Sequence, residues 1–152
     1  MSNSYKQTAI GVIPKEWEVV RLGDIGEVVN GLTYSPENIS DYGLLVLRSS
    51  NIQNNIIVSN NSDDIYLSGI NQFNKTIEND ILICVRNGSK NLIGKNALIT
   101  KKYSDVAFGA FMTIYRSNFN LFLSHIFKTN IFFKQVSSNL GATINSINNS
   151  DL

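Results

Sequence analysis

Two short polar segments carry the side chains best suited to contact a nucleic acid, at residues 48–51 (RSSN) and 86–91 (RNGSKN). Arginine, lysine and asparagine bind phosphates and base edges, and glycine and serine let backbone amides approach a phosphate oxygen. Each segment directly follows an apolar run that is typical of a buried strand, at residues 44–47 and 81–85. The pattern therefore predicts two recognition loops mounted on a sheet, with ordinary polar hairpin loops as the alternative.

Basic residues gather in one part of a chain whose net charge is only +1. Residues 1–85 hold 5 Lys or Arg and 10 Asp or Glu, a net charge of −5. Residues 86–134 hold 8 Lys or Arg and the single acid Asp105, a net charge of +7. Such asymmetry indicates a surface that faces a polyanion. The alternative is a solvated face whose counter-charges lie in the folded first half.

Motifs for catalysis are absent from the sequence. It contains neither a phosphate-binding glycine-rich loop nor a serine nucleophile elbow. His125 has no catalytic partner nearby in sequence, and we interpret it as a structural or surface residue. Cys84 lies in an apolar run, where a small buried hydrophobe is expected. The acidic pairs at 63–64 and 78–80 lack metal-loop spacing and predict solvated turns. We therefore expect a binding protein without a metal site rather than an enzyme.

The composition indicates one folded domain, residues 1–152. With 43% apolar and 16% charged residues, the chain can build a core and is unlike a disordered protein. No apolar run reaches the roughly 18 residues that span a bilayer, and the N-terminus lacks the apolar region of a secretory signal. A single cysteine excludes an internal disulfide framework and fits the reducing cytoplasm, where we expect the protein.

Hydrophobic periodicity predicts short strands followed by two helices. The strands are expected at 17–22, 27–29, 44–47, 56–58, 81–86, 97–100 and 106–116. Helical spacing begins after Asn118, with Asn118 or Asn120 as N-cap, and a second helix over 131–140 should end at Gly141. We expect an α+β fold, a mainly antiparallel or mixed twisted sheet with a C-terminal helical hairpin packed on it. Trp17 is expected in the core.

Short motifs also follow one another in order along nearly the whole chain. They are GVIPKEW at 11–17, LGDI at 22–25, NG at 30–31, LRSSNI at 47–52, NDILI at 79–83, GS at 88–89, GKNA at 94–97 and LGATI at 140–144. Their order and spacing resemble the target recognition domain of type I restriction-modification specificity subunits, which read DNA. Asn79 stands where that family usually has glycine, and Ala142 is a mild variant of the last motif; the first departure concerns turn geometry more than function.

The resemblance implies a place in a larger assembly. Specificity subunits of this family carry two recognition domains, each reading one half of a split DNA site, separated by long helices that set the spacing. Those helices dock the modification subunits, which are adenine methyltransferases, and the restriction subunit joins the complex. S-adenosylmethionine, ATP and Mg²⁺ would be bound by these partners, so no cofactor is expected here. Because the chain stops near Leu152, where the first spacer helix would begin, we expect one N-terminal recognition domain.

We therefore expect a non-enzymatic domain that recognises one half of a bipartite site in double-stranded DNA. The residues assigned to reading or anchoring are Arg48, Asn51, Arg86, Asn87, Ser89 and Lys90, and those assigned to phosphates are Lys95, Lys101 and Lys102. One alternative is the recognition domain of a fused restriction-methyltransferase enzyme. Another is an α+β module that binds a protein or a carbohydrate. Salt-dependent binding of duplex DNA separates the latter from the main hypothesis.

Overall fold

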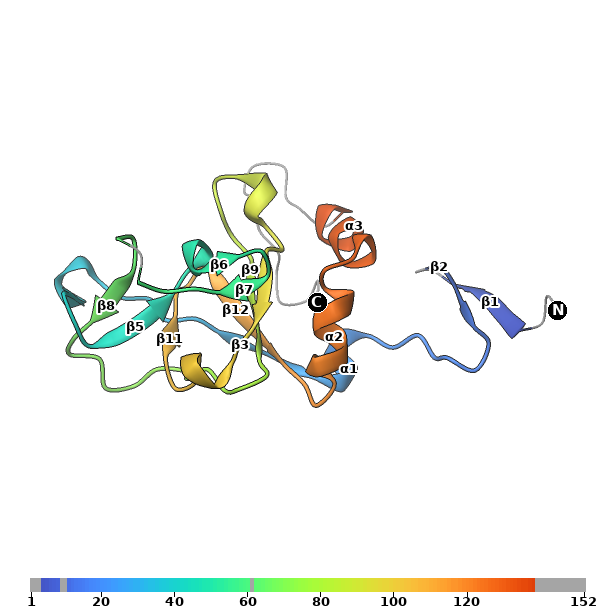
Figure 1. Cartoon of the computed structure of the whole chain (residues 1–152), viewed down its shortest axis with the longest axis horizontal. Helices are drawn as coiled ribbons and strands as arrows, with labels where there is room; N and C mark the ends of the chain where they lie inside the picture. Colours follow the sequence, from blue (N-terminus) through green and yellow to red (C-terminus); the bar gives the residue numbers. More distant parts are fainter. Residues whose placement is uncertain (1–3, 9–10, 61, 139–152) are drawn as a thin grey trace.

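Short strands joined by tight turns build most of the protein. The computed structural model describes residues 4–8, 11–60 and 62–138. Within these residues the strands form two four-stranded sheets and two two-stranded ones. The helical hairpin lies against one end of this β-rich body, and the second four-stranded sheet lies at the other end (Figure 1). The expected α+β class, with antiparallel and mixed pairing, is confirmed.

The first sheet is antiparallel, with strand order β10-β9-β12-β3. Its strands are β3 (Glu27–Asn30), β9 (Ile81–Cys84), β10 (Asn96–Leu98) and β12 (Met112–Arg116). Every residue of β9 is buried. Leu82 and Cys84 pack into the core beneath the second sheet, whereas Ile81 and Ile83 pack against the helices. This is the period-two alternation of a strand covered on both faces, and it explains the uninterrupted apolar run.

The second sheet is mixed, with strand order β11-β5-β8-β4. Its strands are β4 (Ile39–Ser40), β5 (Leu44–Leu47), β8 (Ile65–Leu67) and β11 (Ala107–Phe108), and only β11 runs parallel to its neighbour β5. Two further hairpins pair β6 (Ile52–Gln53) with β7 (Ile56–Ile57), and β1 (Tyr5–Thr8) with β2 (Gly11–Pro14). Four 3₁₀ turns complete the described part: η2 (Pro36–Asn38), η3 (Ser49–Asn51), η4 (Lys90–Leu92) and η5 (Lys101–Tyr103).

The helical hairpin packs on the first sheet as predicted. Helix α2 (Asn120–Ile126) and helix α3 (Asn130–Ser138) bury Leu123, Phe127, Phe132 and Val136 against it. The rings of Phe127 and Phe132 stack with their centroids 4.4 Å apart. The residue before α2 is Phe119, which makes no side-chain cap, so the expected asparagine cap is wrong. Gly141, the expected helix end, lies outside the described residues.

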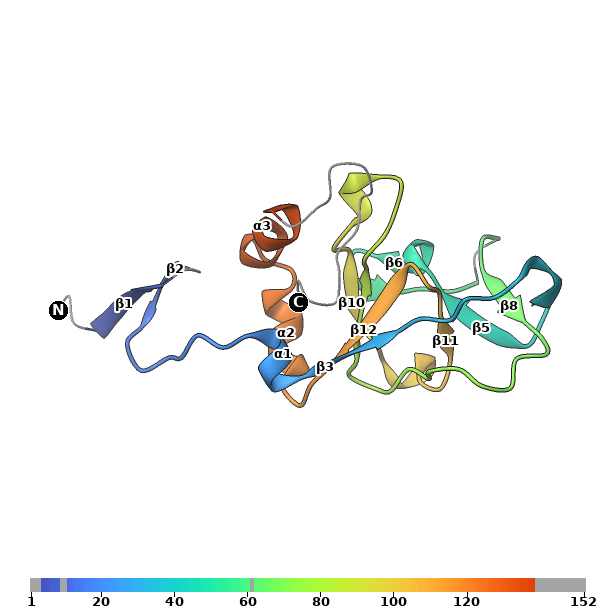
Figure 2. The ribbon, with the colours of Figure 1, turned by 180° about the vertical axis from the view of Figure 1, so that it is seen from behind.

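The N-terminal segment differs most from the sequence-based expectation. Residues 17–21 form no strand, and 22–25 form the short helix α1 (Leu22–Ile25). Residues 15–21 carry the β1-β2 hairpin away from the rest of the molecule (Figures 1 and 2). Trp17 is consequently 54% exposed, and its placement in the core was wrong. No helix or strand of the main body lies beside this extended segment in either view.

The strand predicted over 106–116 is broken into two. Residues 109–111 form a turn between β11 and β12, and Met112 N–H donates to Gly109 O at 3.0 Å across it. Because of this turn, one apolar run supplies an edge strand to the second sheet and a central strand to the first. The strands β1, β2, β4, β6 and β8 were not predicted.

Candidate nucleic-acid interface

The two predicted loops meet at one cavity of about 570 Å³. Strand β5 lies beside β11, with Leu47 opposite Phe108, and β12 lies beside β9, with Met112 opposite Cys84. The turn at 109–111 that joins β11 to β12 is therefore placed between the ends of β5 and β9. The lining includes Arg48 and Ser49 from one loop, Arg86, Asn87 and Gly88 from the other, and Phe111 from the turn.

Backbone hydrogen bonds fix the relative positions of these three segments. Gly109 N–H donates to Leu47 O at 2.9 Å, which ties the turn to the end of β5. The N–H groups of Val85 and Arg86 both donate to Phe111 O, at 3.0 and 3.2 Å, which ties the turn to the end of β9. Side chains add a direct link between the loops, because Asn87 Nδ2 donates to Ser49 Oγ at 3.5 Å. Hydrogen bonds therefore connect the two loops and the turn that line the cavity.

The two arginines of the cavity differ in their exposure and in the contacts that their side chains make with the protein. Arg48 is partly buried, and its Nη1 donates to Asp63 O at 3.0 Å. Arg86 is exposed, and its guanidinium carbon lies 5.8 Å from the ring centroid of Phe111, within cation–π range. Phe111 itself is 56% exposed. An exposed guanidinium with one face against an aromatic ring suits a ligand that accepts two hydrogen bonds, such as a base edge or a phosphate.

Asn51 lies in the interior of the protein, whereas the sequence suggested a residue that contacts DNA. Its side chain is fully buried, and Oδ1 accepts from Arg48 N–H at 2.9 Å. Nδ2 donates to Val58 O at 2.9 Å and to Asp64 Oδ1 at 2.8 Å. All three partners belong to the protein, so we assign Asn51 to shaping the loop that carries Arg48 rather than to contacting DNA.

The lysines assigned to phosphates do not share one face. Lys95 is partly buried, and its Nζ donates to Ser49 O at 3.0 Å, which fixes the first loop from beneath. Ser89 and Lys90 are exposed at η4, next to the cavity loop. Lys101 and Lys102 are exposed at η5, which lies at the lower edge of Figure 1, whereas η4 lies at the upper edge. Figure 2 shows the same separation.

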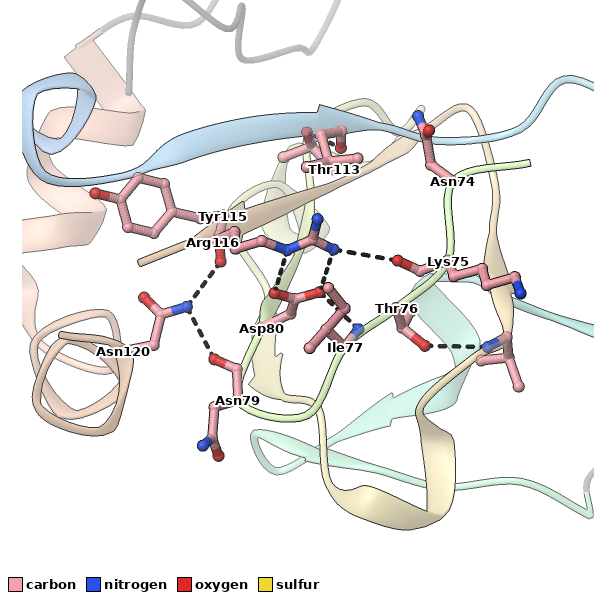
Figure 3. Close-up of polar contacts among 12 residues, drawn as sticks. Asn74, Lys75, Thr76, Ile77, Asn79, Asp80, Thr113, Tyr115, Arg116 and Asn120 are labelled. Atoms are coloured by element: carbon pink, nitrogen blue, oxygen red, sulfur yellow. Dashed lines mark hydrogen bonds and ion pairs between the residues drawn. The ribbon is translucent and has the colours of Figure 1, made fainter. Parts of the chain in front are cut away.

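Arg116, a further basic residue of segment 86–134, is engaged within the protein. Its Nε and Nη2 donate to the two carboxylate oxygens of Asp80 at 2.9 and 2.8 Å (Figure 3). Asp80 is 2% exposed and also accepts from Ile77 N–H at 2.8 Å, so the solvated turn expected here is wrong. Hydrogen bonding to Asp80 raises the pKa of Arg116, which keeps this ion pair charged. Beside it, Asn120 Nδ2 joins α2 to Asn79 O and Tyr115 O.

The remaining candidates for chemistry have structural or surface positions. Cys84 is fully buried, its Sγ donates to Arg86 O at 3.6 Å, and burial raises its thiol pKa, which disfavours the nucleophilic thiolate. His125 is exposed on α2, in line with the surface alternative. Among the described residues, no three His, Cys, Asp or Glu side chains are grouped to hold a metal ion. What the described site offers is hydrogen bonding, charge and one open aromatic ring.

Sequence reasoning missed the turn at 109–111 and with it Phe111. The signal was present, because Gly109-Ala110 interrupts an otherwise β-branched and aromatic run with two small residues. The cavity is also lined by the segment that follows β3, at Leu32, Thr33 and Tyr34. No helix in the described part of the chain is long and apolar enough to cross a membrane.

Fold and site together define a binding domain in which two arginines from separate loops share one cavity. The sequence matches, over residues 14–152, the family described as the type I restriction modification DNA specificity domain. Because the match covers most of the chain, the protein belongs to this family.

Individual relatives agree with the family match. The chain is 28% identical over 145 residues to the specificity subunit of the type I restriction enzyme EcoKI from Escherichia coli (strain K12). It is 26% identical over 145 residues to that of StySPI from Salmonella potsdam. Each alignment covers 90% of this chain and 31% of the relative, so the chain spans about a third of the length of these subunits.

Solved structures show the same fold. One comes from work on complex assembly and conformational transition of the type I R-M system; it has a TM-score of 0.68 and 18% identity, over 92% of this chain and 33% of that one. The HsdS subunit from Thermoanaerobacter tengcongensis has a TM-score of 0.63 and 14% identity, over 96% and 35% of the two chains.

Proposed function

We propose that this domain reads one half of a bipartite target in double-stranded DNA, as part of a type I restriction-modification specificity subunit. The observation that carries the proposal is the meeting of the loops at 48–51 and 86–91 in a single arginine-lined cavity. Family membership supports it, because the family is described as a DNA specificity domain. The domain itself performs no catalysis in this proposal and works in the cytoplasm with a modification subunit and a restriction subunit. S-adenosylmethionine, ATP and Mg²⁺ belong to those partners.

The proposed DNA contacts centre on the cavity and the adjoining turn η4. Arg48, Arg86 and Asn87 face the bases or the groove edge from the cavity, and Ser89 and Lys90 anchor a neighbouring phosphate. Asn51 and Lys95 are positioning residues, because their polar groups bind the loop backbone. We leave Lys101 and Lys102 outside the interface, since η5 lies at the opposite edge of the molecule (Figure 1).

Two double variants of equal charge change test this placement. Arg86→Ala/Lys90→Ala removes two positive charges at the cavity, and Lys101→Ala/Lys102→Ala removes two at η5; all four side chains are exposed. Duplex binding is measured by fluorescence anisotropy between about 50 and 200 mM salt, where neutralisation of phosphates controls the slope of affinity against salt. The cavity variant should bind more weakly, with a slope smaller by about one for each phosphate that the protein no longer neutralises.

The η5 variant is the matched control and should keep both affinity and slope. An equal weakening of binding in the two variants would show that charge acts without a defined interface. If the unmodified chain shows no salt-dependent binding to duplex DNA, the proposal is wrong, and the alternative of a domain that recognises a protein or a carbohydrate is favoured instead.

A further inference from the structure

The hydrogen-bonding groups of the Arg86 side chain are open to a ligand. Among the described residues its guanidinium contacts the ring of Phe111, and none of the guanidinium N–H groups donates to a protein acceptor. Arg48 at the same cavity already has Nη1 engaged by Asp63 O, and Arg116 has Nε and Nη2 engaged by Asp80. Arg86 is therefore the cavity arginine that retains a complete planar fork of donors.

The backbone that carries the Phe111 ring is tied to the loop of Arg86. Phe111 belongs to the turn between β11 and β12, and its carbonyl accepts from both Val85 N–H and Arg86 N–H. The side chains of Phe111 and Arg86 are also in contact, with the guanidinium carbon 5.8 Å from the ring centroid. A cation–π contact on one face of a guanidinium restricts its rotation and leaves the in-plane N–H groups free.

The chemistry of an oriented guanidinium selects one base. A guanidinium donates two parallel hydrogen bonds, and in the major groove guanine alone offers two acceptors side by side, O6 and N7. We propose that Arg86 reads a guanine in the target half-site and that Phe111 is the positioning residue that fixes its guanidinium for this contact. This inference rests on the proposed function and deepens it, because it names the base and the residue pair that reads it.

Selection from a random-duplex pool tests the assignment to guanine. The full 152-residue chain is compared with Arg86→Ala, which removes the guanidinium and all of its donors, and bound duplexes are sequenced. The unmodified chain should enrich a motif with one guanine that Arg86→Ala no longer requires. Replacing that guanine by 7-deazaguanine, which lacks the N7 acceptor, should weaken binding of the unmodified chain about 5- to 150-fold and leave Arg86→Ala unaffected. Arg21→Ala, at an exposed arginine next to α1, is the matched control and should keep the motif.

Phe111 is tested through its dependence on Arg86. Phe111→Leu should reduce the guanine preference several-fold with the salt slope unchanged, and Phe111→Tyr, which retains a ring, should restore it. In the Arg86→Ala background, Phe111→Leu should have no further effect on base preference. An equal reduction in both backgrounds would show that Phe111 contacts DNA independently and would overturn its positioning role.

The possible outcomes distinguish the inference about Arg86 from the proposed function on which it rests. Enrichment of a motif by the unmodified chain, with the same guanine retained by Arg86→Ala, overturns the inference and leaves DNA recognition standing. No enriched motif from the unmodified chain overturns the proposed function, and the inference with it.

Discussion

Replacing Asn51 by alanine distinguishes a residue that shapes a loop from one that touches DNA. The buried amide makes two hydrogen bonds to backbone groups, of Arg48 and Val58, and one to the carboxylate of Asp64. A neutral hydrogen bond contributes about 1 kcal/mol to stability and one to a charged group about 2 kcal/mol. Asn51→Ala should therefore lower the free energy of unfolding by about 4 kcal/mol. Against a typical total of about 5–15 kcal/mol, the domain remains largely folded at 25 °C.

Urea unfolding followed by far-UV circular dichroism measures this decrease in stability. Tryptophan fluorescence is a poor probe of the core here, because Trp17, the single tryptophan, is 54% exposed on the N-terminal segment. DNA binding is then measured without urea, and the apparent affinity is corrected for the fraction of the protein that is folded.

Asn87→Ala is the matched control for Asn51→Ala. Asn87 is partly buried at the cavity; its Oδ1 accepts from Ser89 N–H at 2.9 Å and its Nδ2 donates to Ser49 Oγ at 3.5 Å. The first contact is local and exposed and the second, at 3.5 Å, is long, so the substitution should lower stability by only about 1 kcal/mol while weakening DNA binding. The reasoning is refuted if Asn51→Ala unfolds at the wild-type urea midpoint yet binds DNA more weakly, since the amide would then act on the ligand and not on the loop.

Three further changes test the scaffold. A Cβ on Gly31 would lie 1.9 Å from Gly109 O, so Gly31→Ala should destabilise by at least about 1–3 kcal/mol in thermal unfolding, whereas Gly109→Ala, whose Cβ meets nothing nearer than 3.8 Å, should be tolerated. Asp80→Ala leaves Arg116 without its carboxylate and should lower the free energy of urea unfolding by about 2–4 kcal/mol; an unchanged midpoint would contradict the role of the ion pair. Because burial raises the pKa of Cys84, the folded chain keeps the thiol proton at pH values where the unfolded chain has released it. Stability should thus be complete below the unfolded pKa of about 8.5 and fall as the pH rises above it, and Cys84→Ala, measured alongside between about pH 8 and 9.5, should show a smaller decline.

The sequence could predict the strands and helices in which burial makes apolar residues recur at a regular spacing. Strands β5 and β9 are apolar throughout because both of their faces are covered, and α2 and α3 repeat apolar residues at helical spacing. The N-terminal segment carries a comparable apolar pattern, yet Trp17 is 54% exposed. Periodicity reports which residues share a face and does not report whether a partner covers that face.

Asparagines take backbone positions that glycine often fills. Among the described residues, four asparagines have positive φ angles: Asn54, Asn55, Asn60 and Asn79, at 53°, 62°, 70° and 74°. Asparagine enters this region more readily than most residues. The positive φ of Asn79 forms the turn before β9, and the Asn79 carbonyl accepts from Asn120 Nδ2 at 2.8 Å.

The site itself depends on pairing between distant segments, which charge counting does not detect. The excess charge of segment 86–134 includes Arg116, which is engaged by Asp80, and two lysines at η5, at the far edge from η4. What brings Arg48 and Arg86 together is the sequence of pairings β5–β11 and β12–β9 across the turn at 109–111. These contacts join residues separated by about 25 to 60 positions, and no local pattern specifies them. A recognition surface of this kind follows from topology, so the residues that read DNA are better sought where strand ends meet than where charges are dense in the sequence.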